Sequence, residues 1–107
     1  MPEDADIVRE EIFGPVVAVT TFTDDDRAIE QANDTIFGLA AYVFSENLTK
    51  ALSAAEALES GMVAVNKGSL SDPSAPFGGV KQSGLGREGG FTGIDEFLEE
   101  KLISLEG

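Results

Sequence analysis

The chain has 107 residues, of which 42% are apolar, and this composition excludes a disordered protein. It contains no cysteine and no histidine, so disulfides, thiolate nucleophiles and thiolate or imidazole metal sites are excluded within it. Twenty acidic residues against seven basic ones give a net charge of -13, which argues against nucleic acid and against a membrane surface as partners.

A chain of this mass predicts one domain, whose folding would bury roughly 65% of the surface of the unfolded chain. No apolar run approaches the length of about 20 residues that spans a bilayer. The acidic start has the pattern of neither a signal peptide nor a transit peptide. These features together predict a cytoplasmic protein.

The segment up to Val65 alternates between strand and helix patterns. Short apolar and β-branched runs predict strands, and apolar residues at helical spacing predict helices. The order β-α-β-α-β, with helices long enough to act as crossovers, predicts an α/β fold with a parallel or mixed sheet. The predicted strands cover residues 15–22, 39–44 and 62–65, and the predicted helices cover residues 47–59 and a stretch that begins at Thr23 or Asp24 and stops at residues 33–35.

Beyond Val65 the pattern changes to a long glycine-rich loop. Residues 66–90 contain seven glycines and two prolines, and a loop of this length in a compact domain is usually functional. A short helix over residues 91–99 and a last strand over residues 101–105 complete the predicted fold.

Within this loop, the stretch from Gly84 to Gly89 matches the G-x-G-x-x-G pattern of dinucleotide-binding sites. That fingerprint needs a strand directly before it and a helix that opens from it, followed by a second βα unit. Here a loop precedes the pattern and too little chain follows it. We therefore interpret these glycines as a tight path packed against neighbouring backbone, and a small nucleotide-binding protein is a disfavoured alternative.

Four sequence blocks follow a pattern that occurs in a known enzyme family. They are Glu10–Val16, Gln31–Thr35 with Phe37–Ala41, Ser60–Asn66 and Ala75–Gly89. In order, at the family spacing and over nearly all of the chain, these blocks resemble the aldehyde dehydrogenase superfamily. Within the superfamily the sequence is most similar to succinate-semialdehyde dehydrogenases.

The resemblance implies which part of an enzyme the chain would represent. Family enzymes are several times longer, with a Rossmann-type domain and a catalytic domain that carries a cysteine nucleophile and a glutamate base. Residues 1–107 would be the C-terminal part of that catalytic domain, and residues 100–107 would be a tail strand used in subunit contacts. The Rossmann domain and the nucleophile segment would lie outside this chain.

The implied activity is that of an oxidoreductase dependent on NAD or NADP. The full-length enzyme would oxidise an aldehyde substrate, succinate semialdehyde above all, to the corresponding acid. The isolated chain would be inactive and would bind no cofactor, because the nucleophile, the base and the dinucleotide fold are outside it. No residue of this chain is therefore predicted to be catalytic.

The resemblance also suggests roles for individual residues. Glu11 would accept hydrogen bonds from the nicotinamide ribose hydroxyls, unless it is simply an exposed glutamate. Phe13 would lie beside the nicotinamide ring, with a place in the core as the equal alternative. Phe77 would line the substrate tunnel or anchor the loop, and Ser71 would help to hold a distal carboxylate or be an ordinary loop serine. Arg87 is expected to anchor the loop rather than to touch substrate.

A function of a different class stays open, namely a free-standing structural or oligomerisation module without a catalytic role. Residues 101–105 would then form an edge strand with unpaired backbone groups, ready to pair with another chain. On either interpretation we expect a homo-oligomer formed through the C-terminal strand.

Overall fold

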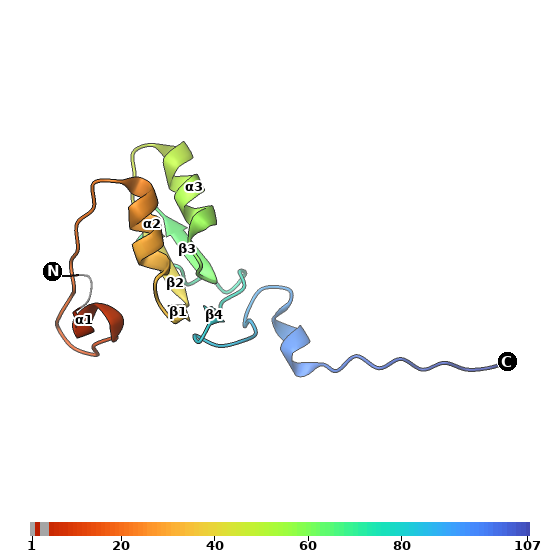
Figure 1. The fold of residues 1–107 in the computed structure, drawn as a ribbon. Coiled ribbons are helices and arrows are strands. Elements are labelled where there is room, and N and C mark those ends of the chain that lie inside the picture. Colours follow the sequence, from red (N-terminus) through yellow and green to blue (C-terminus); the bar gives the residue numbers. More distant parts are fainter. Residues whose placement is uncertain (1, 3–4) are drawn as a thin grey trace. The chain divides into compact units, whose positions relative to one another are not determined.

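The computed structural model describes Pro2 and residues 5–107, and the chain divides into two compact units. The first unit ends at Thr35, and the second runs from Ile36 to Gly107. In Figure 1 the first unit is coloured from red to orange and the second from yellow to blue.

Two helices form the regular structure that is described in the first unit, α1 (Asp6–Arg9) and α2 (Asp25–Asn33). The Asp24 carboxylate caps α2, because its Oδ1 accepts a hydrogen bond of 3.0 Å from the backbone N–H of Arg27. Of the two caps that the sequence allows, the structure therefore selects Asp24. Acidic residues in the first turn complement the positive end of the helix dipole.

Residues 15–22, which the sequence predicts as a strand, form no strand in the structure. A β-branched run favours an extended backbone, but it becomes a strand only where a neighbouring strand completes its hydrogen bonds. No strand of the described chain pairs with this segment. Its apolar side chains, among them Val17 and Phe22, lie exposed.

The second unit contains the predicted parallel sheet. Strands β2 (Ala40–Val43) and β3 (Met62–Val65) pair in parallel, residue for residue from Ala40 with Met62 onward. Helix α3 (Leu48–Ala57) connects them, as a parallel pair requires. This β-α-β arrangement confirms the central part of the predicted fold.

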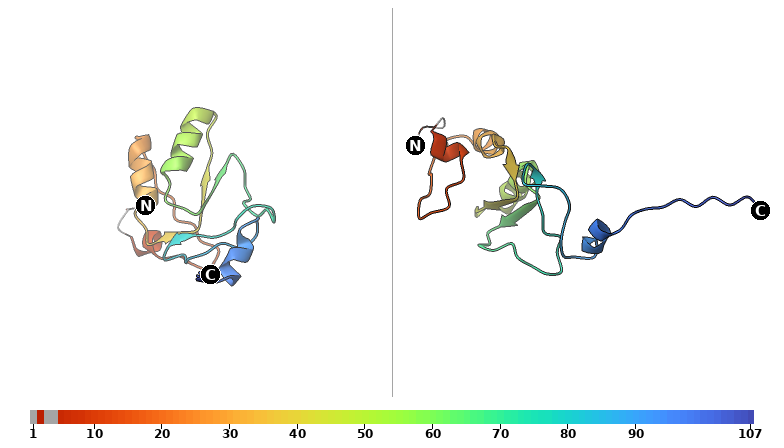
Figure 2. Two further views of the ribbon diagram at one scale, coloured as in Figure 1. Left: turned by 90° about the vertical axis from the view of Figure 1, so that its right-hand side faces the viewer. Right: turned by 90° about the horizontal axis from the view of Figure 1, so that it is seen from below.

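The core of the second unit lies where α3 packs on the two strands, and Figures 1 and 2 show the helix running beside them. Ala51 on the helix is fully buried, and Ala64 on β3 is 4% exposed. Both are small side chains, so helix and sheet approach closely but bury little apolar area. Asn47 caps the helix by accepting a hydrogen bond from the Lys50 N–H at 3.1 Å.

A second small sheet ties the glycine-rich loop to the start of this unit. Strand β1 (Phe37–Gly38) pairs antiparallel with β4 (Val80–Lys81), so β4 interrupts the loop predicted over residues 66–90. The helix predicted over 91–99 is a shorter 3₁₀ helix, η1 (Gly93–Phe97).

Residues 101–105 form no strand within the described chain. The physical reason is the same as for residues 15–22: an extended segment becomes a strand only beside a partner. Leu102, Ile103 and Leu105 are exposed along this tail, which Figure 1 draws in dark blue.

The chain exposes far more surface than its mass predicts. Its accessible surface is 8792 Å², whereas a compact monomer of 11.2 kDa exposes about 5,700 Å². On the same scale folding buries about 46% of the unfolded surface, so the expectation of 65% is wrong. All seven phenylalanines are exposed, at 37% to 100%. Among the described residues, no helix has the length and apolarity that crossing a membrane requires.

Candidate functional site

The predicted site residues lie on two loops, one in each unit. Glu11 and Phe13 are neighbours on the loop between α1 and α2. Ser71 and Phe77 share the glycine-rich loop of the second unit. Each pair therefore shares one loop.

Phe13 lies at the tip of a tight turn. The backbone N–H of Gly14 donates to the carbonyl oxygen of Ile12 at 3.0 Å, which closes a turn of the γ type with Phe13 as its central residue. The side chain of Phe13 is 94% exposed. Glu11, which precedes this turn, is also exposed. Core packing, the alternative for Phe13, does not occur in this chain.

The backbone after Ser71 is shaped by its neighbour Asp72. The Asp72 Oδ1 accepts hydrogen bonds from the Ser74 hydroxyl at 2.7 Å and from the Ser74 backbone N–H at 2.9 Å. These two bonds, the hydroxyl first, hold the pKa of Asp72 below its ordinary value of 3.8. Asp72 is therefore ionised at neutral pH. An anion held by the Ser71 hydroxyl needs cationic groups nearby to offset this charge.

Phe77 is fixed by its backbone. Its N–H donates to the carbonyl oxygen of Glu88 at 2.7 Å, and the Glu88 N–H donates back to the Phe77 carbonyl at 2.8 Å. This reciprocal pair is an antiparallel bridge between two distant parts of the loop. Phe77 itself is 37% exposed, so part of its ring is accessible.

Arg87 holds the loop through carbonyl groups. Its Nη1 donates to the carbonyl oxygens of Gly79 and Gly86, both at 2.7 Å and in a partly buried position. Its backbone N–H donates to the Glu96 carboxylate at 3.0 Å. The expectation that Arg87 anchors the loop is therefore confirmed.

Close backbone approach explains several glycines of this region. A Cβ atom at Gly61 would overlap the carbonyl oxygen of Gly78, and one at Gly38 would lie 2.5 Å from the carbonyl oxygen of Glu59. The Gly61 N–H donates to the Gly38 carbonyl at 2.9 Å. The sheet ends and the loop thus meet at a junction that admits no side chain at these positions.

The stretch from Gly84 to Gly89 does not have the structure of a dinucleotide fingerprint. No helix opens from it, because η1 begins only at Gly93 and has five residues. Gly86 has a φ of +85° and lies so near Glu96 that a Cβ would come within 2.8 Å of its Oε2. The predicted packing against neighbouring backbone holds at Gly89, where a Cβ would lie 3.1 Å from the Ala75 carbonyl oxygen, whereas Gly86 meets a side chain and a Cβ at Gly84 would meet nothing within 4 Å.

The sequence did not predict a pair of hydrogen bonds at the start of the loop, here called the Asn66 clasp, which joins the Asn66 side-chain amide to the backbone of Ser45. The Asn66 side chain accepts a hydrogen bond from the Ser45 N–H and donates one to the Ser45 carbonyl, each at 2.9 Å. Asn66 has a φ of +52°, a conformation that asparagine tolerates better than most residues. An asparagine directly after a short apolar run is the one signal of it in the sequence. The clasp closes the ends of β2 and β3, from which the loop departs.

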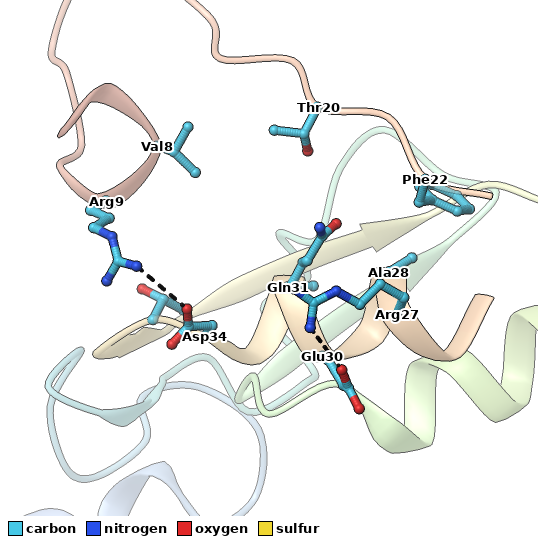
Figure 3. A pocket seen from close by; sticks show the side chains of 11 residues that line it. Val8, Arg9, Thr20, Phe22, Arg27, Ala28, Glu30, Gln31 and Asp34 are labelled. Carbon is cyan, nitrogen blue, oxygen red and sulfur yellow. Dashed lines mark hydrogen bonds and ion pairs between the residues drawn. The ribbon is translucent and has the colours of Figure 1, made fainter. Parts of the chain in front are cut away.

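A hollow of about 930 Å³ lies within the first unit, beside α2 (Figure 3). Its two arginines are paired with carboxylates, Arg9 with Asp34 at 3.8 Å and Arg27 with Glu30 at 2.9 Å. These pairs offset the positive charge that an anion would need, so we place no site there. No group of three potential metal ligands occurs among the described residues.

Comparison with known proteins identifies the family. The model of the aldehyde dehydrogenase family matches residues 1–103. The chain belongs to the aldehyde dehydrogenase family. It is 57% identical over 97 residues to the aspartate-semialdehyde dehydrogenase (non-phosphorylating) of Halomonas elongata, covering 91% of this chain and 20% of that protein. It is 51% identical over 105 residues to a succinate-semialdehyde dehydrogenase of Paenarthrobacter nicotinovorans, covering 98% of this chain and 23% of that protein.

Solved structures of the aldehyde dehydrogenase family confirm the α/β fold class. The crystal structure of succinate-semialdehyde dehydrogenase from Burkholderia pseudomallei matches with a TM-score of 0.86 and 50% identity, over 90% of this chain and 20% of that one. The chain thus spans about a fifth of the length of the relatives it matches. Other matched proteins are named for betaine aldehyde and indole-3-acetaldehyde.

Proposed function

We propose that this chain is the C-terminal part of the catalytic domain of an NAD(P)-dependent aldehyde dehydrogenase whose substrate is a semialdehyde with a distal carboxylate. The supporting observation is the 51% identity to a protein named succinate-semialdehyde dehydrogenase over 98% of the chain. The relative named for aspartate semialdehyde supports the same substrate class, because that compound also carries a carboxylate distant from its aldehyde. Among these compounds, succinate semialdehyde is the substrate we propose.

Glu11 and Phe13 form the cofactor face of this proposal. A carboxylate accepts hydrogen bonds from two adjacent hydroxyls, which suits the ribose of a nicotinamide nucleotide. A phenylalanine ring that is 94% exposed at the tip of a turn presents a flat apolar surface to a planar ring. The two residues therefore fit the group in chemistry. When bound, the nicotinamide accepts hydride, and these side chains would orient it.

Ser71 and Phe77 form the substrate face. The accessible part of the Phe77 ring would shield the reacting carbonyl from water. The Ser71 hydroxyl would donate to the distal carboxylate, together with cationic groups from outside this chain that offset Asp72. The remainder of the enzyme would supply the cysteine nucleophile and the glutamate base.

The exposed apolar surface supports the same proposal. Side chains of this size are buried in stable domains, and here even Phe91 and Leu85 are almost fully exposed. We infer that the remaining four-fifths of an aldehyde dehydrogenase chain covers much of this surface. The isolated chain is accordingly predicted to be inactive.

A hybrid enzyme tests the proposal directly. In it, this chain replaces the matching C-terminal segment of the Paenarthrobacter nicotinovorans succinate-semialdehyde dehydrogenase. We expect the hybrid to oxidise succinate semialdehyde in the presence of NAD(P)+, and the same enzyme without any C-terminal segment to be inactive. A well-folded hybrid that oxidises no aldehyde would overturn the proposal. A hybrid that prefers butanal, which lacks the distal carboxylate, would overturn only the proposed substrate class.

The apolar tail favours a second candidate, a structural module that joins subunits. Leu102, Ile103 and Leu105 are exposed on a segment without a strand partner in the described chain. Pairing of this tail with another subunit would complete its backbone hydrogen bonds. This role is compatible with the enzyme proposal, and it becomes the main function only if the hybrid is folded, oligomeric and inactive.

A further inference from the structure

The part of the loop that carries Phe77 consists of two short arms, residues 77–79 and 86–88. The reciprocal hydrogen bonds between Phe77 and Glu88 join the arms at one point. At the next point the link comes from a side chain, because Arg87 reaches across from the second arm to the carbonyl oxygen of Gly79 in the first. Its second bond, to the Gly86 carbonyl, fixes the guanidinium on its own arm.

The first arm is seated on the sheet ends. A Cβ atom at Gly79 would lie 3.1 Å from the Gly38 carbonyl oxygen, and the Gly61 backbone lies against Gly78. The Ser83 hydroxyl, in the turn between the arms, accepts a hydrogen bond from the Gly38 N–H at 2.9 Å. These contacts hold the first arm from the side of the sheet, and the Arg87 bond to the Gly79 carbonyl holds it from the side of the second arm.

The Arg87 stem fills the space that a side chain at position 78 would occupy. A Cβ at Gly78 would lie 2.7 Å from the Arg87 Cδ. Removing the arginine would therefore leave a gap directly beside the residue that follows Phe77, as well as two carbonyl groups without their charged donor.

We propose that Arg87 is the positioning residue of Phe77. It acts through the backbone of Gly78 and Gly79, and it does not touch substrate. This inference rests on the proposed function, since it assigns to Phe77 the wall of the substrate tunnel. Both hydrogen bonds leave from one atom, Nη1, and a lysine ammonium lies one bond closer to the backbone, so Arg87→Lys should restore the position of Phe77 only in part.

The experiment compares Arg87→Ala, Arg87→Lys and Phe77→Ala in the hybrid enzyme. We expect Arg87→Ala to raise the KM for succinate semialdehyde about tenfold, because a misplaced wall disturbs the orientation of substrate. The KM for NAD(P)+ should change less than twofold. The KM of Arg87→Lys for succinate semialdehyde should lie between the values for the unsubstituted hybrid and for Arg87→Ala. Arg27→Ala, which removes one exposed arginine from α2, is the matched control and should leave both constants unchanged.

A double mutant separates positioning from general stability. If Arg87 acts through Phe77, then Arg87→Ala combined with Phe77→Ala should raise the KM no further than the more damaging single substitution. Additive effects would overturn the inference, and so would an unchanged KM in Arg87→Ala.

Hydrogen exchange gives a readout that does not depend on the substrate. The backbone amides of Phe77 and Glu88 should exchange at least several-fold faster in Arg87→Ala than in Arg27→Ala. Equal exchange rates of these amides in the two variants would overturn the proposal that Arg87 positions Phe77, even if the enzyme is active. The hybrid could show no preference for the semialdehyde while the amides exchange faster in Arg87→Ala. In that case the proposed substrate class fails, but the positioning of Phe77 by Arg87 is supported.

Discussion

Hydrogen bonds from side chains to backbone groups hold the glycine-rich loop residue by residue. Asn66 fixes its start, Ser74 and Asp72 fix its middle, and Arg87 fixes its far arm. Asp72 and Ser74 are local enough for the sequence to suggest a turn. The carbonyl partners of Arg87 and the clasp of Asn66 could not be predicted, because they depend on which distant segments meet in space.

The Asp72 turn makes a pH prediction. Its pKa is depressed in the folded chain, so the turn's contribution to stability is fully present above pH 3.8 and is lost as the pH falls through the folded pKa. Ser74→Ala removes the hydroxyl donor, and the pKa of Asp72 should rise toward 3.8. An NMR titration of the Asp72 carboxyl measures this shift. Ser53→Ala, an exposed serine on α3, is the control, and equal pKa values in both variants would contradict the prediction.

Ser71 makes a specificity prediction. A hydrogen bond to a charged acceptor contributes about 1.5–3 kcal/mol, so Ser71→Ala in the hybrid should lower kcat/KM for succinate semialdehyde at least tenfold. The value for butanal, which lacks the carboxylate, should barely change. Ser69→Ala, two residues away on the same loop, is the matched control. Equal losses for the two aldehydes would mean that Ser71 does not hold the carboxylate.

At the scale of elements, short apolar runs bounded by clear breakers were predictable. The run Met62–Val65 lies between Gly61 and Asn66 and forms β3 over the predicted range. Residues 15–22 have the same composition signal, yet they form no strand, since no strand of the described chain pairs with them. Four candidate site residues came from family motifs, whereas their exposure depended on packing that a motif does not encode.

The junction between the sheet ends and the loop makes a stability prediction. Gly61→Ala would place a methyl group against the Gly78 carbonyl, and backbone cannot move aside as a flexible side chain can. We expect a loss of about 1–3 kcal/mol and a lower thermal midpoint of the hybrid enzyme. Gly68→Ala is the control, because a Cβ there meets nothing within 4 Å. A thermal midpoint that falls equally in both variants, or that falls in neither, would contradict the close contact between Gly61 and the Gly78 carbonyl.

At the scale of the whole molecule, apolar exposure and net charge act against each other. The accessible surface exceeds that of a compact monomer about 1.5-fold, and the exposed part includes every phenylalanine. Such surface favours association. The net charge of -13 repels a second copy, and this repulsion is screened by salt over a Debye length that falls from about 30 Å at 0.01 M to about 10 Å at 0.1 M.

The balance predicts that the 107-residue chain self-associates and does so more strongly as salt rises. Sedimentation velocity at tens of micromolar should show a larger oligomeric fraction at 0.15 M salt than at 0.01 M. Replacing Leu102 and Leu105 by lysine should reduce that fraction if the tail is a contact, whereas the same change at exposed Val17 and Phe22 tests the first unit. The lysines also lower the net negative charge, which alone would favour association, so a reduction can be attributed to the lost apolar contact. A monomer at both salt concentrations would show that the exposed apolar surface does not drive assembly.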